Sequence, residues 1–193
     1  MNKINNISVY ILCGGKNIRM QKEKGLVLYK SQPFIQHIIN AIKPISKKIF
    51  LVTDNNLYQK FGYPLVNDEY KDKGPVGGIY SALKHSNTHY NIILSCDIPN
   101  ITTSILNTYL SKEIYQKEIT FLKDEQYEYP LIGVYSKHLV SKFEEAINTN
   151  ILRLLRLIKC MDYKTIEIEV NDKVYVKNIN TRQELELLKY EML

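Results

Sequence analysis

The chain has few of the residues that disulfide-rich, zinc-binding or membrane-spanning proteins need. It contains only three cysteines, Cys13, Cys96 and Cys160, which are widely spaced and form no CxxC or Cys/His cluster. They argue against a disulfide framework and a zinc site, and we expect reduced thiols. No stretch approaches the ~18 consecutive apolar residues of a membrane span, so we expect a soluble, cytoplasmic protein without a membrane partner.

The positive charge of the chain is not concentrated in one segment. The net charge is +6 and the pI is about 9.0, but Lys and Arg are spread along the sequence with Asp and Glu among them. A nucleic-acid-binding protein usually has a basic run interleaved with aromatic residues, so we expect no nucleic-acid partner. A diffuse positive field instead suits small polyanionic substrates, because it raises their local concentration.

Apolar residues alternate between strand and helix patterns. Continuous apolar runs predict buried strands at Ile7–Leu12, Ile49–Thr53 and Tyr90–Ser95, and a face of isoleucines predicts a helix over 35–42. Further helices are expected at 57–61, 77–84, 103–115, 139–147, 151–158 and from 181 onward, and further strands at 64–66, 119–123, 129–135, 166–170 and 174–176. This alternation predicts one α/β domain in which helices cover both faces of a mostly parallel sheet, with ligands beyond the carboxyl ends of the strands.

Six of the eight glycines fall in two segments that we expect to be loops. The first contains Gly14, Gly15 and Gly25, and the second contains Gly74, Gly77 and Gly78. Such loops bring backbone N–H groups close to phosphate oxygens, and Arg19 and Lys24 add positive charge to the first one. The pattern is neither G-x-G-x-x-G nor a P-loop, so a tight turn with two solvated bases is the alternative.

An acidic residue follows the strand predicted at 90–95. Asp97 lies in Ser95-Cys96-Asp97-Ile98-Pro99, where a proline two residues later constrains the turn. A carboxylate at the carboxyl end of a strand can bind Mg²⁺ while phosphates fill other positions, although a turn-forming Asp is the alternative. Asp68, which follows the short strand predicted at 64–66, is a further carboxylate candidate with a weaker individual case.

An ordered series of motifs covers nearly the whole chain. It consists of Leu12-Cys13-Gly14-Gly15, Arg19-Met20, Glu23-Lys24-Gly25-Leu26, Gln32-Pro33-Phe34, Pro64-Leu65-Val66, Asp68, Gly74–Ile79, Cys96–Pro99, Tyr129–Tyr135 and Asn178-Ile179-Asn180-Thr181. The series resembles the molybdenum cofactor guanylyltransferases (MobA proteins). Its first motif recurs in many sugar- and polyol-phosphate nucleotidyltransferases, whereas the ordered set with the terminal Asn-x-Asn-Thr is more specific.

The resemblance implies a fold and a reaction. The fold would be a three-layer Rossmann-like nucleotidyltransferase fold with a mostly parallel, mixed sheet, formed by a single domain over residues 1–193. About residues 1–100 would form the nucleotide-binding half, and about residues 101–193 the acceptor- or pterin-binding half. The reaction would transfer GMP from Mg-GTP to the molybdenum-molybdopterin cofactor, with molybdopterin guanine dinucleotide and diphosphate as products. A cofactor-delivery protein or a recipient molybdoenzyme is a further candidate partner.

The resemblance also implies roles for individual residues. The nucleotide-binding set would be Leu12, Cys13, Gly14, Gly15, Lys24, Asp68 and Asp97, together with one residue among Thr53, Asp54 and Asn55. Asp97 would also bind Mg²⁺, and the catalytic set would be Arg19, Lys24 and Asp97. Asn178 and Asn180 would bind the acceptor, while a helix cap at Asn180 or Thr181 is the alternative reading of this segment.

Three points remain open. Gln21 replaces a usual Gly of the family, so the conformation of the first loop cannot be deduced if a positive φ is required there. A cytidylyltransferase that acts on molybdopterin or on a polyol phosphate is an alternative enzyme. A non-catalytic pterin-cofactor binding protein is an alternative of another class.

Overall fold

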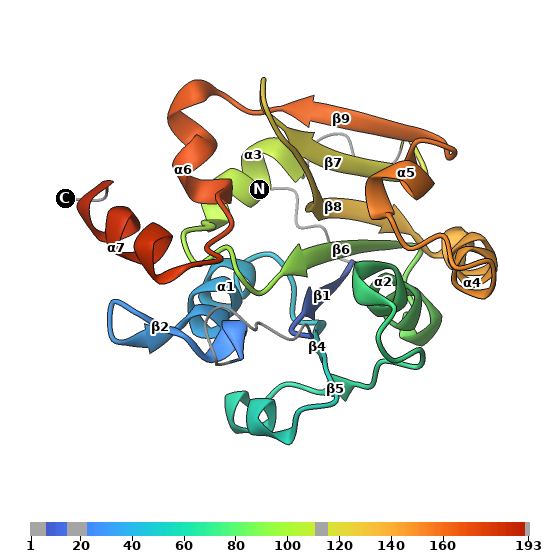
Figure 1. Cartoon of the computed structure of the whole chain (residues 1–193), viewed down its shortest axis with the longest axis horizontal. Coiled ribbons are helices and arrows are strands. Elements are labelled where there is room, and N and C mark those ends of the chain that lie inside the picture. Colours follow the sequence, from blue (N-terminus) through green and yellow to red (C-terminus); the bar gives the residue numbers. More distant parts are fainter. Residues whose placement is uncertain (1–6, 15–22, 111–115, 192–193) are drawn as a thin grey trace.

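The structure, a computed structural model, describes residues 7–14, 23–110 and 116–191, and has helices on both faces of a central sheet (Figure 1). Over these residues the sheet contains seven strands. They are β1 (Ser8–Leu12), β4 (Ile49–Val52), β5 (Leu65–Val66), β6 (Tyr90–Ser95), β7 (Ile119–Lys123), β8 (Glu128–Ser136) and β9 (Tyr163–Glu167). A separate ribbon consists of β2 (Leu28–Tyr29) and β3 (Gln32–Pro33).

The strand order across the sheet is β5-β4-β1-β6-β8-β7-β9. β8 runs antiparallel to β6 and β7, whereas the other neighbouring strands are parallel. The chain passes from β1 to β4 and β5 on one side and then returns to β6 on the other side of β1. β1 therefore lies where the strand order reverses, which is the usual place for a ligand site in such a sheet. The prediction of a mostly parallel, mixed sheet in three layers is confirmed.

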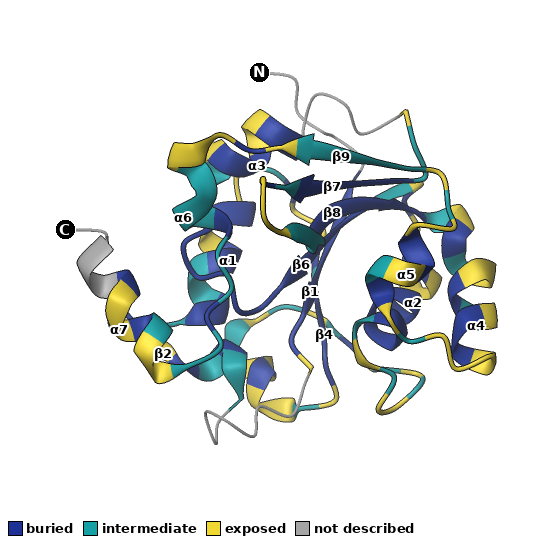
Figure 2. Cartoon of the chain, turned by 45° about the horizontal axis from the view of Figure 1, so that its top comes forward, coloured by how far each residue is buried: buried dark blue, intermediate teal, exposed yellow. Residues whose placement is uncertain are grey.

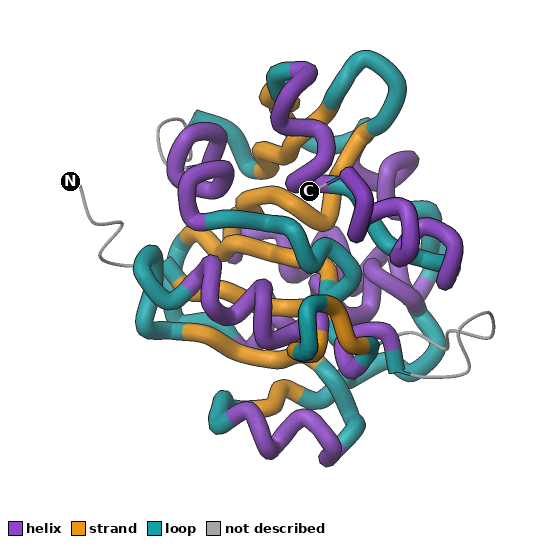
Figure 3. The backbone as a smooth tube through the Cα atoms, turned by 90° about the vertical axis from the view of Figure 1, so that its left-hand side faces the viewer, coloured by secondary structure: helices purple, strands orange, loops and turns teal. Residues whose placement is uncertain are grey.

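The helices divide between the two faces of the sheet. The α-helices in the described ranges are α1 (Phe34–Ile42), α2 (Gly74–His85), α3 (Thr103–Leu110), α4 (Val140–Asn148), α5 (Leu154–Ile158), α6 (Lys173–Val176) and α7 (Arg182–Glu191). Short 3-10 turns are η1 (Lys24–Leu26), η2 (Asn56–Phe61), η3 (Lys137–Leu139) and η4 (Val170–Asp172). α1 and α3 pack on one face, and α2, α4 and α5 pack on the other. Figure 3 shows the stacked strands from the side.

The centre of the sheet is buried on both faces, as Figure 2 shows for β1 and β6. Val9 and Ile11 of β1 pack with α1 and α3, whereas Tyr10 and Leu12 pack with α2 and α4. Successive side chains of a strand point to opposite faces, so a strand covered on both sides must be apolar throughout. This is the physical reason why the continuous apolar runs predicted these strands.

Several elements differ from their prediction. The strand predicted at 174–176 is wrong, because these residues belong to α6, where Val176 is buried in the core. The strand predicted at 166–170 lies at Tyr163–Glu167, where it pairs with β7, and Val170 belongs to η4. The helix predicted at 151–158 begins at Leu154. Pairing and packing with distant residues decided these boundaries, since alternation over a few residues is ambiguous.

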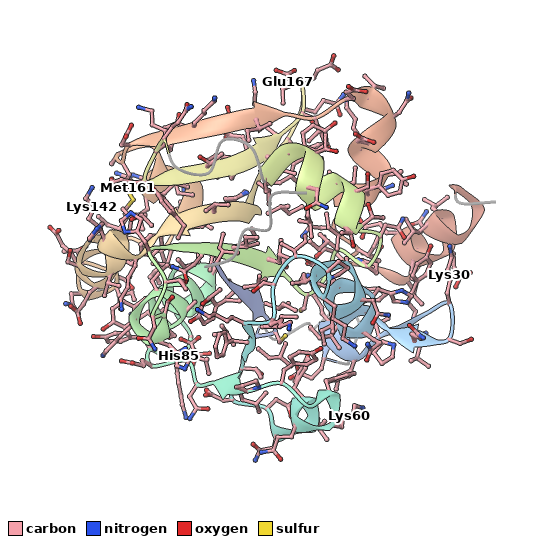
Figure 4. All side chains as sticks on the ribbon, turned by 180° about the vertical axis from the view of Figure 1, so that it is seen from behind. Lys30, Lys60, His85, Lys142, Met161 and Glu167 are labelled. Carbon is pink, nitrogen blue, oxygen red and sulfur yellow. The ribbon has the colours of Figure 1, made fainter. Side chains whose placement is uncertain are left out.

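Charge is spread over the outside of the molecule. Lys30, Lys60 and Lys142 are exposed and lie on different sides of it (Figure 4). No single basic face is therefore formed by these labelled lysines. None of the helices in the described ranges has the length and apolar character needed to cross a membrane.

Gly133→Ala is expected to lower the free energy of unfolding by about 1–3 kcal/mol through overpacking. A Cβ at Gly133 in β8 would come 2.7 Å from the carbonyl oxygen of Thr120 and 2.8 Å from Cβ of Phe121, both in β7. Backbone atoms in the middle of a sheet cannot move aside, so the strands would have to separate. Urea unfolding measures the difference.

Gly78→Ala is the matched control. A Cβ there would lie 3.4 Å from the side chain of Leu12, which is ordinary van der Waals contact. Ala also favours a helix interior over Gly by about 0.8–1.0 kcal/mol. Gly78→Ala should therefore not destabilise the fold, and equal losses in both variants would contradict the packing argument at Gly133.

Candidate functional site

A pocket of about 920 Å³ opens at the carboxyl ends of β1, β4, β5 and β6. Its lining comes from the residues that follow these strands, including Leu12, Thr53, Asp68 and Asp97. The pocket therefore lies at the point where the strand order reverses, as the fold argument requires. The structure brings together Lys24, Asp68 and Asp97, which the sequence placed in three separate segments.

Lys24 and Asp97 form an ion pair in this pocket. Lys24 Nζ lies 2.8 Å from Asp97 Oδ2, and the two side chains are 25% and 7% exposed, respectively. Lys24 extends from η1, while Asp97 stands two residues after the end of β6. Because both charges are largely removed from water, their attraction is stronger than that of a surface pair.

The other oxygen of Asp97 is held by two neutral donors. Ser95 Oγ donates to Asp97 Oδ1 at 2.5 Å, and Asn178 Nδ2 donates to the same oxygen at 2.6 Å. The Asp97 carbonyl group accepts the N–H of Ile179 at 2.8 Å, and Lys24 Nζ also donates to Asn180 Oδ1. The predicted acceptor residues Asn178 and Asn180 thus lie directly against Asp97 and Lys24.

The terminal Asn-x-Asn-Thr segment also caps α7. Thr181 Oγ1 accepts the N–H of Glu184 at 3.1 Å, and Glu184 Oε2 accepts the N–H groups of Thr181 and Asn180 at 2.9 and 2.6 Å. This is a reciprocal capping box, and it confirms the helix cap that the sequence offered as the alternative reading of this segment. Thr181 supplies the capping side chain, whereas the side-chain oxygen of Asn180 faces Lys24.

The groups around Asp97 suit Mg²⁺ that is bound together with phosphates. Among the residues that the structure describes, no group of three or more His, Cys, Asp or Glu side chains could hold a metal. A metal cage made by protein alone is therefore not formed there. Mg²⁺ commonly binds through one or two carboxylates and the phosphates of a substrate, and a single buried carboxylate at the wall of a pocket fits that arrangement.

Two further carboxylates lie on the side of the pocket formed after β4 and β5. Asp54 Oδ1 accepts the N–H of Asp68 at 3.2 Å, and Ser81 Oγ of α2 donates to Asp68 Oδ1 at 3.1 Å. Burial raises the pKa of Asp68, the hydrogen bond from Ser81 lowers it, and the Asp54 carboxylate adds a smaller increase, with a raised pKa as the net result. A half-buried carboxylate of this kind is a strong acceptor for sugar hydroxyl or base N–H groups.

The helix predicted at 77–84 is confirmed as α2, and the assignment of Gly77 and Gly78 to a phosphate-binding loop is wrong, because both lie inside that helix. A Cβ at Gly77 would come 3.0 Å from the carbonyl oxygen of Tyr70 and 3.3 Å from Asp68 Oδ1. At Gly78 it would touch Leu12 at the end of β1. These glycines allow α2 to pack closely against the residues that form the pocket, which is a packing role.

The first glycine segment is described only in part, since Gly15, Arg19 and Gln21 lie outside the described residues. Gly14 lines the pocket, and Cys13 is buried beneath it. The Cys13 N–H donates to the Val52 carbonyl group at 3.0 Å, so it is not available to a phosphate. Burial raises the pKa of the Cys13 thiol well above its usual value, and the side chain therefore acts as a small neutral group.

Two serines that contact the site carboxylates, Ser95 and Ser81, were not predicted from the sequence, and only one of them could have been. Ser95 stands two residues before Asp97, a spacing at which a hydroxyl group commonly bonds to its neighbours, and this could have been recognised. Ser81 has no such signal, because a serine in a helix is ordinary without knowledge of what packs on it. The three candidates after β4, Thr53, Asp54 and Asn55, all line the pocket. Of these, Asp54 accepts the backbone N–H of Asp68.

Comparison with known proteins identifies a family of nucleotidyltransferase domains that matches most of the chain. The family described as "MobA-like NTP transferase domain" matches residues 9–163. A relative from Flavobacterium johnsoniae, named "Probable molybdenum cofactor guanylyltransferase", is 44% identical over 179 residues, which cover 93% of this chain and 94% of the relative.

Two solved structures have the same fold. A protein from Aquifex aeolicus VF5 matches with a TM-score of 0.81 and 28% identity, over 94% of this chain and 96% of that one. The molybdopterin-guanine dinucleotide biosynthesis protein A from Archaeoglobus fulgidus matches with a TM-score of 0.82 and 21% identity, over 96% and 98% of the two chains. At that lower identity the second match supports the fold alone.

Asp68→Asn is expected to raise the free energy of unfolding at neutral pH. Because burial raises the pKa of the folded Asp68 carboxyl, ionised Asp68 destabilises the fold above that pKa, and this cost is absent below the unfolded value of ~3.9. Asn retains an acceptor for Ser81 and adds no charge beside Asp54. The gain should fade as the pH is lowered, which urea unfolding at a series of pH values measures.

Asp124→Asn is the control with the opposite sign. Burial raises the pKa of Asp124, but hydrogen bonds from Tyr129 and from the N–H groups of Gln126 and Tyr127 lower it by more, and its net pKa is below the usual value. This variant should be less stable than the wild type at neutral pH, with the difference disappearing in acid. A loss of stability in Asp68→Asn at neutral pH would contradict the account of Asp68.

Proposed function

This chain belongs to the MobA-like NTP transferase family, and we propose that it transfers GMP from Mg-GTP to the molybdenum-molybdopterin cofactor. The enzyme class, nucleotidyltransferase, follows from the family. The products would be molybdopterin guanine dinucleotide and diphosphate. The observation that carries the proposal is the Lys24–Asp97 ion pair, with a buried carboxylate and a partly buried lysine, in a pocket at the carboxyl ends of the strands.

The relative that is 44% identical supports the choice of nucleotide and acceptor, because its name specifies a guanylyl group and the molybdenum cofactor. The pocket volume of about 920 Å³ is also suitable. It lies near the upper end of the ~300–1,000 Å³ range of ligand pockets, which leaves room for a nucleotide and the phosphate of a second substrate. We place the reaction in the cytoplasm, with GTP and the pterin cofactor as substrates.

The proposed chemistry is an in-line displacement at phosphorus. The terminal phosphate of the acceptor would attack the α-phosphorus of GTP, and diphosphate would leave. A phosphate nucleophile is already ionised at neutral pH, so alignment and neutralisation of charge matter more than a strong base. Mg²⁺, when bound, would neutralise charge on the phosphates and orient them.

The residues of the chain would divide these tasks. Asp97 would hold Mg²⁺ and the nucleotide, Lys24 would bind phosphate, and Asp68 would accept hydrogen bonds from the guanosine part. Backbone groups of Leu12–Gly15 would approach the nucleotide, with Arg19 adding positive charge. Asn180, which lines the pocket, remains a candidate contact for the acceptor. A cofactor-delivery protein or a recipient molybdoenzyme would be the protein partner.

GTP with Mg²⁺ is expected to raise the melting temperature of the protein more than CTP or ATP with Mg²⁺. A ligand present at 100 times its Kd stabilises the folded state by ~2.7 kcal/mol. Differential scanning fluorimetry at equal nucleotide concentrations makes the comparison. Stabilisation by CTP and not by GTP would exclude guanylyl transfer and favour a cytidylyltransferase.

Asp97→Ala is expected to abolish Mg²⁺-dependent diphosphate release, and Lys24→Ala to reduce it by about two to three orders of magnitude, the scale of one electrostatic contact to the transition state. The assay combines GTP, Mg²⁺ and the molybdenum-molybdopterin cofactor. Lys142→Ala, which removes an exposed lysine paired with Glu118, should behave like the wild type.

The same assay on the wild type tests the alternative that the protein is a non-catalytic pterin-cofactor binding protein. A protein that binds GTP and the pterin but releases no diphosphate would be a binding protein and not an enzyme. Near-wild-type turnover in Asp97→Ala would remove that residue from the proposed chemistry.

A further inference from the structure

Asn178 stands in the terminal segment where acceptor binding was expected, but its amide contacts the carboxylate of Asp97. We propose that Asn178 is a positioning residue for Asp97, which fixes the carboxylate for Mg²⁺ and the nucleotide, and does not bind the acceptor. The inference rests on the proposed function, because it concerns how Asp97 is presented to Mg-GTP.

The first argument is the division of hydrogen bonds between the two oxygens of Asp97. Oδ1 accepts from Asn178 Nδ2 at 2.6 Å and from Ser95 Oγ at 2.5 Å, while Oδ2 faces Lys24. An ionised carboxylate only accepts hydrogen bonds, so the amide NH₂ of Asn178 must be the group that faces it. Two donors on one oxygen restrict the rotation of the carboxylate. The other oxygen, Oδ2, therefore stays on the side of Lys24, where Mg²⁺ would also bind.

The second argument is that Asn178 is placed by the fold itself. Ile179 is fully buried with Phe34, Leu185 and Leu188, and its N–H donates to the Asp97 carbonyl group. The carboxylate of Glu184 accepts the next two N–H groups of the chain, those of Asn180 and Thr181. In Figure 1 the arrowhead of β6 points toward the chain that links α6 to α7. Asn178 is therefore held beside Asp97 by the backbone contacts of the three residues that follow it.

The third argument is the cost of any other use of the amide. If Asn178 Nδ2 turned to an acceptor molecule, Asp97 Oδ1 would lose one of its two donors in a place where Asp97 is only 5% exposed. A largely buried charged oxygen that loses a hydrogen-bond donor is unfavourable. Asn178 does not line the pocket, whereas Asn180 does. The two asparagines of the motif thus have different surroundings and different tasks.

The test measures metal binding without the acceptor. Mn²⁺ replaces Mg²⁺, and electron paramagnetic resonance measures its binding in the presence of GTP for the wild type, Asn178→Ala and the control Asn148→Ala. Asn148 is an exposed residue at the end of α4. Removing a residue that orients a metal ligand usually weakens metal affinity by about 10–100-fold. We expect that loss in Asn178→Ala and wild-type binding in Asn148→Ala.

The full reaction provides a second readout. In Asn178→Ala the Mg²⁺ concentration that gives the half-maximal rate should rise by about 10–100-fold, as for Mn²⁺ binding. High Mg²⁺ should restore most of the rate. KM for the acceptor should stay within about twofold of the wild-type value. A general structural defect would not be corrected by Mg²⁺. Unchanged Mn²⁺ binding in Asn178→Ala overturns the inference, whether or not KM for the acceptor rises.

A second variant covers the case in which Asn178→Ala does not fold. Ser95→Ala removes the other donor to Asp97 Oδ1 and must show the same increase in metal requirement, and normal Mn²⁺ binding in it overturns the inference. Failure of the proposed function would be distinguishable, since a wild type that binds no Mn²⁺ with GTP contradicts that proposal before any variant is compared.

Discussion

The buried carboxylate of Asp97 is the constraint on which the site depends. An ionised carboxylate with a side chain 7% exposed is costly to fold unless charge and hydrogen bonds replace its water. Those partners come from three distant parts of the chain: Lys24 after the first strand, Ser95 at the end of β6, and the Asn178–Ile179 segment near the C-terminus. One carboxylate therefore connects the glycine segment, the centre of the sheet and the C-terminal helix.

The sheet explains why these parts meet. β1 and β6 are parallel neighbours in register, with Leu12 beside Ser95, so the segments that follow them leave the sheet at the same edge. β4 and β5 bring Asp54 and Asp68 to the other side of the same pocket, and the glycines of α2 let that helix pack against them. The result is a cavity with the Lys24–Asp97 ion pair on one side and the carboxylates of Asp54 and Asp68 on the other. Such an arrangement suits a ligand with a phosphate end and a nucleoside end.

Much of the fold could be predicted from the sequence, because strands buried on both faces must be apolar throughout. The short elements near the C-terminus could not, since the run at 174–176 has the same apolar character whether it is a strand or the turn of helix that α6 forms. Lys24, Asp68 and Asp97 could be identified as candidate site residues from their types and their positions in segments after strands, and the structure places all three in the lining of one pocket. The contact of Asn178 with Asp97 spans 81 residues, and no local pattern predicts it. The error at Gly77 and Gly78 has a similar origin, because glycine occurs both in phosphate-binding loops and where a helix packs closely on distant residues.

The most direct measurement of the central claim is the fate of labelled phosphorus. GTP that carries ³²P at the α or the γ position is incubated with the protein, Mg²⁺ and the molybdenum-molybdopterin cofactor, and the products are separated. If the site catalyses displacement at the α-phosphorus, the α label will appear in the pterin dinucleotide and the γ label in diphosphate. Transfer of the γ label to the acceptor, or release of the α label as free GMP or GDP, would contradict it.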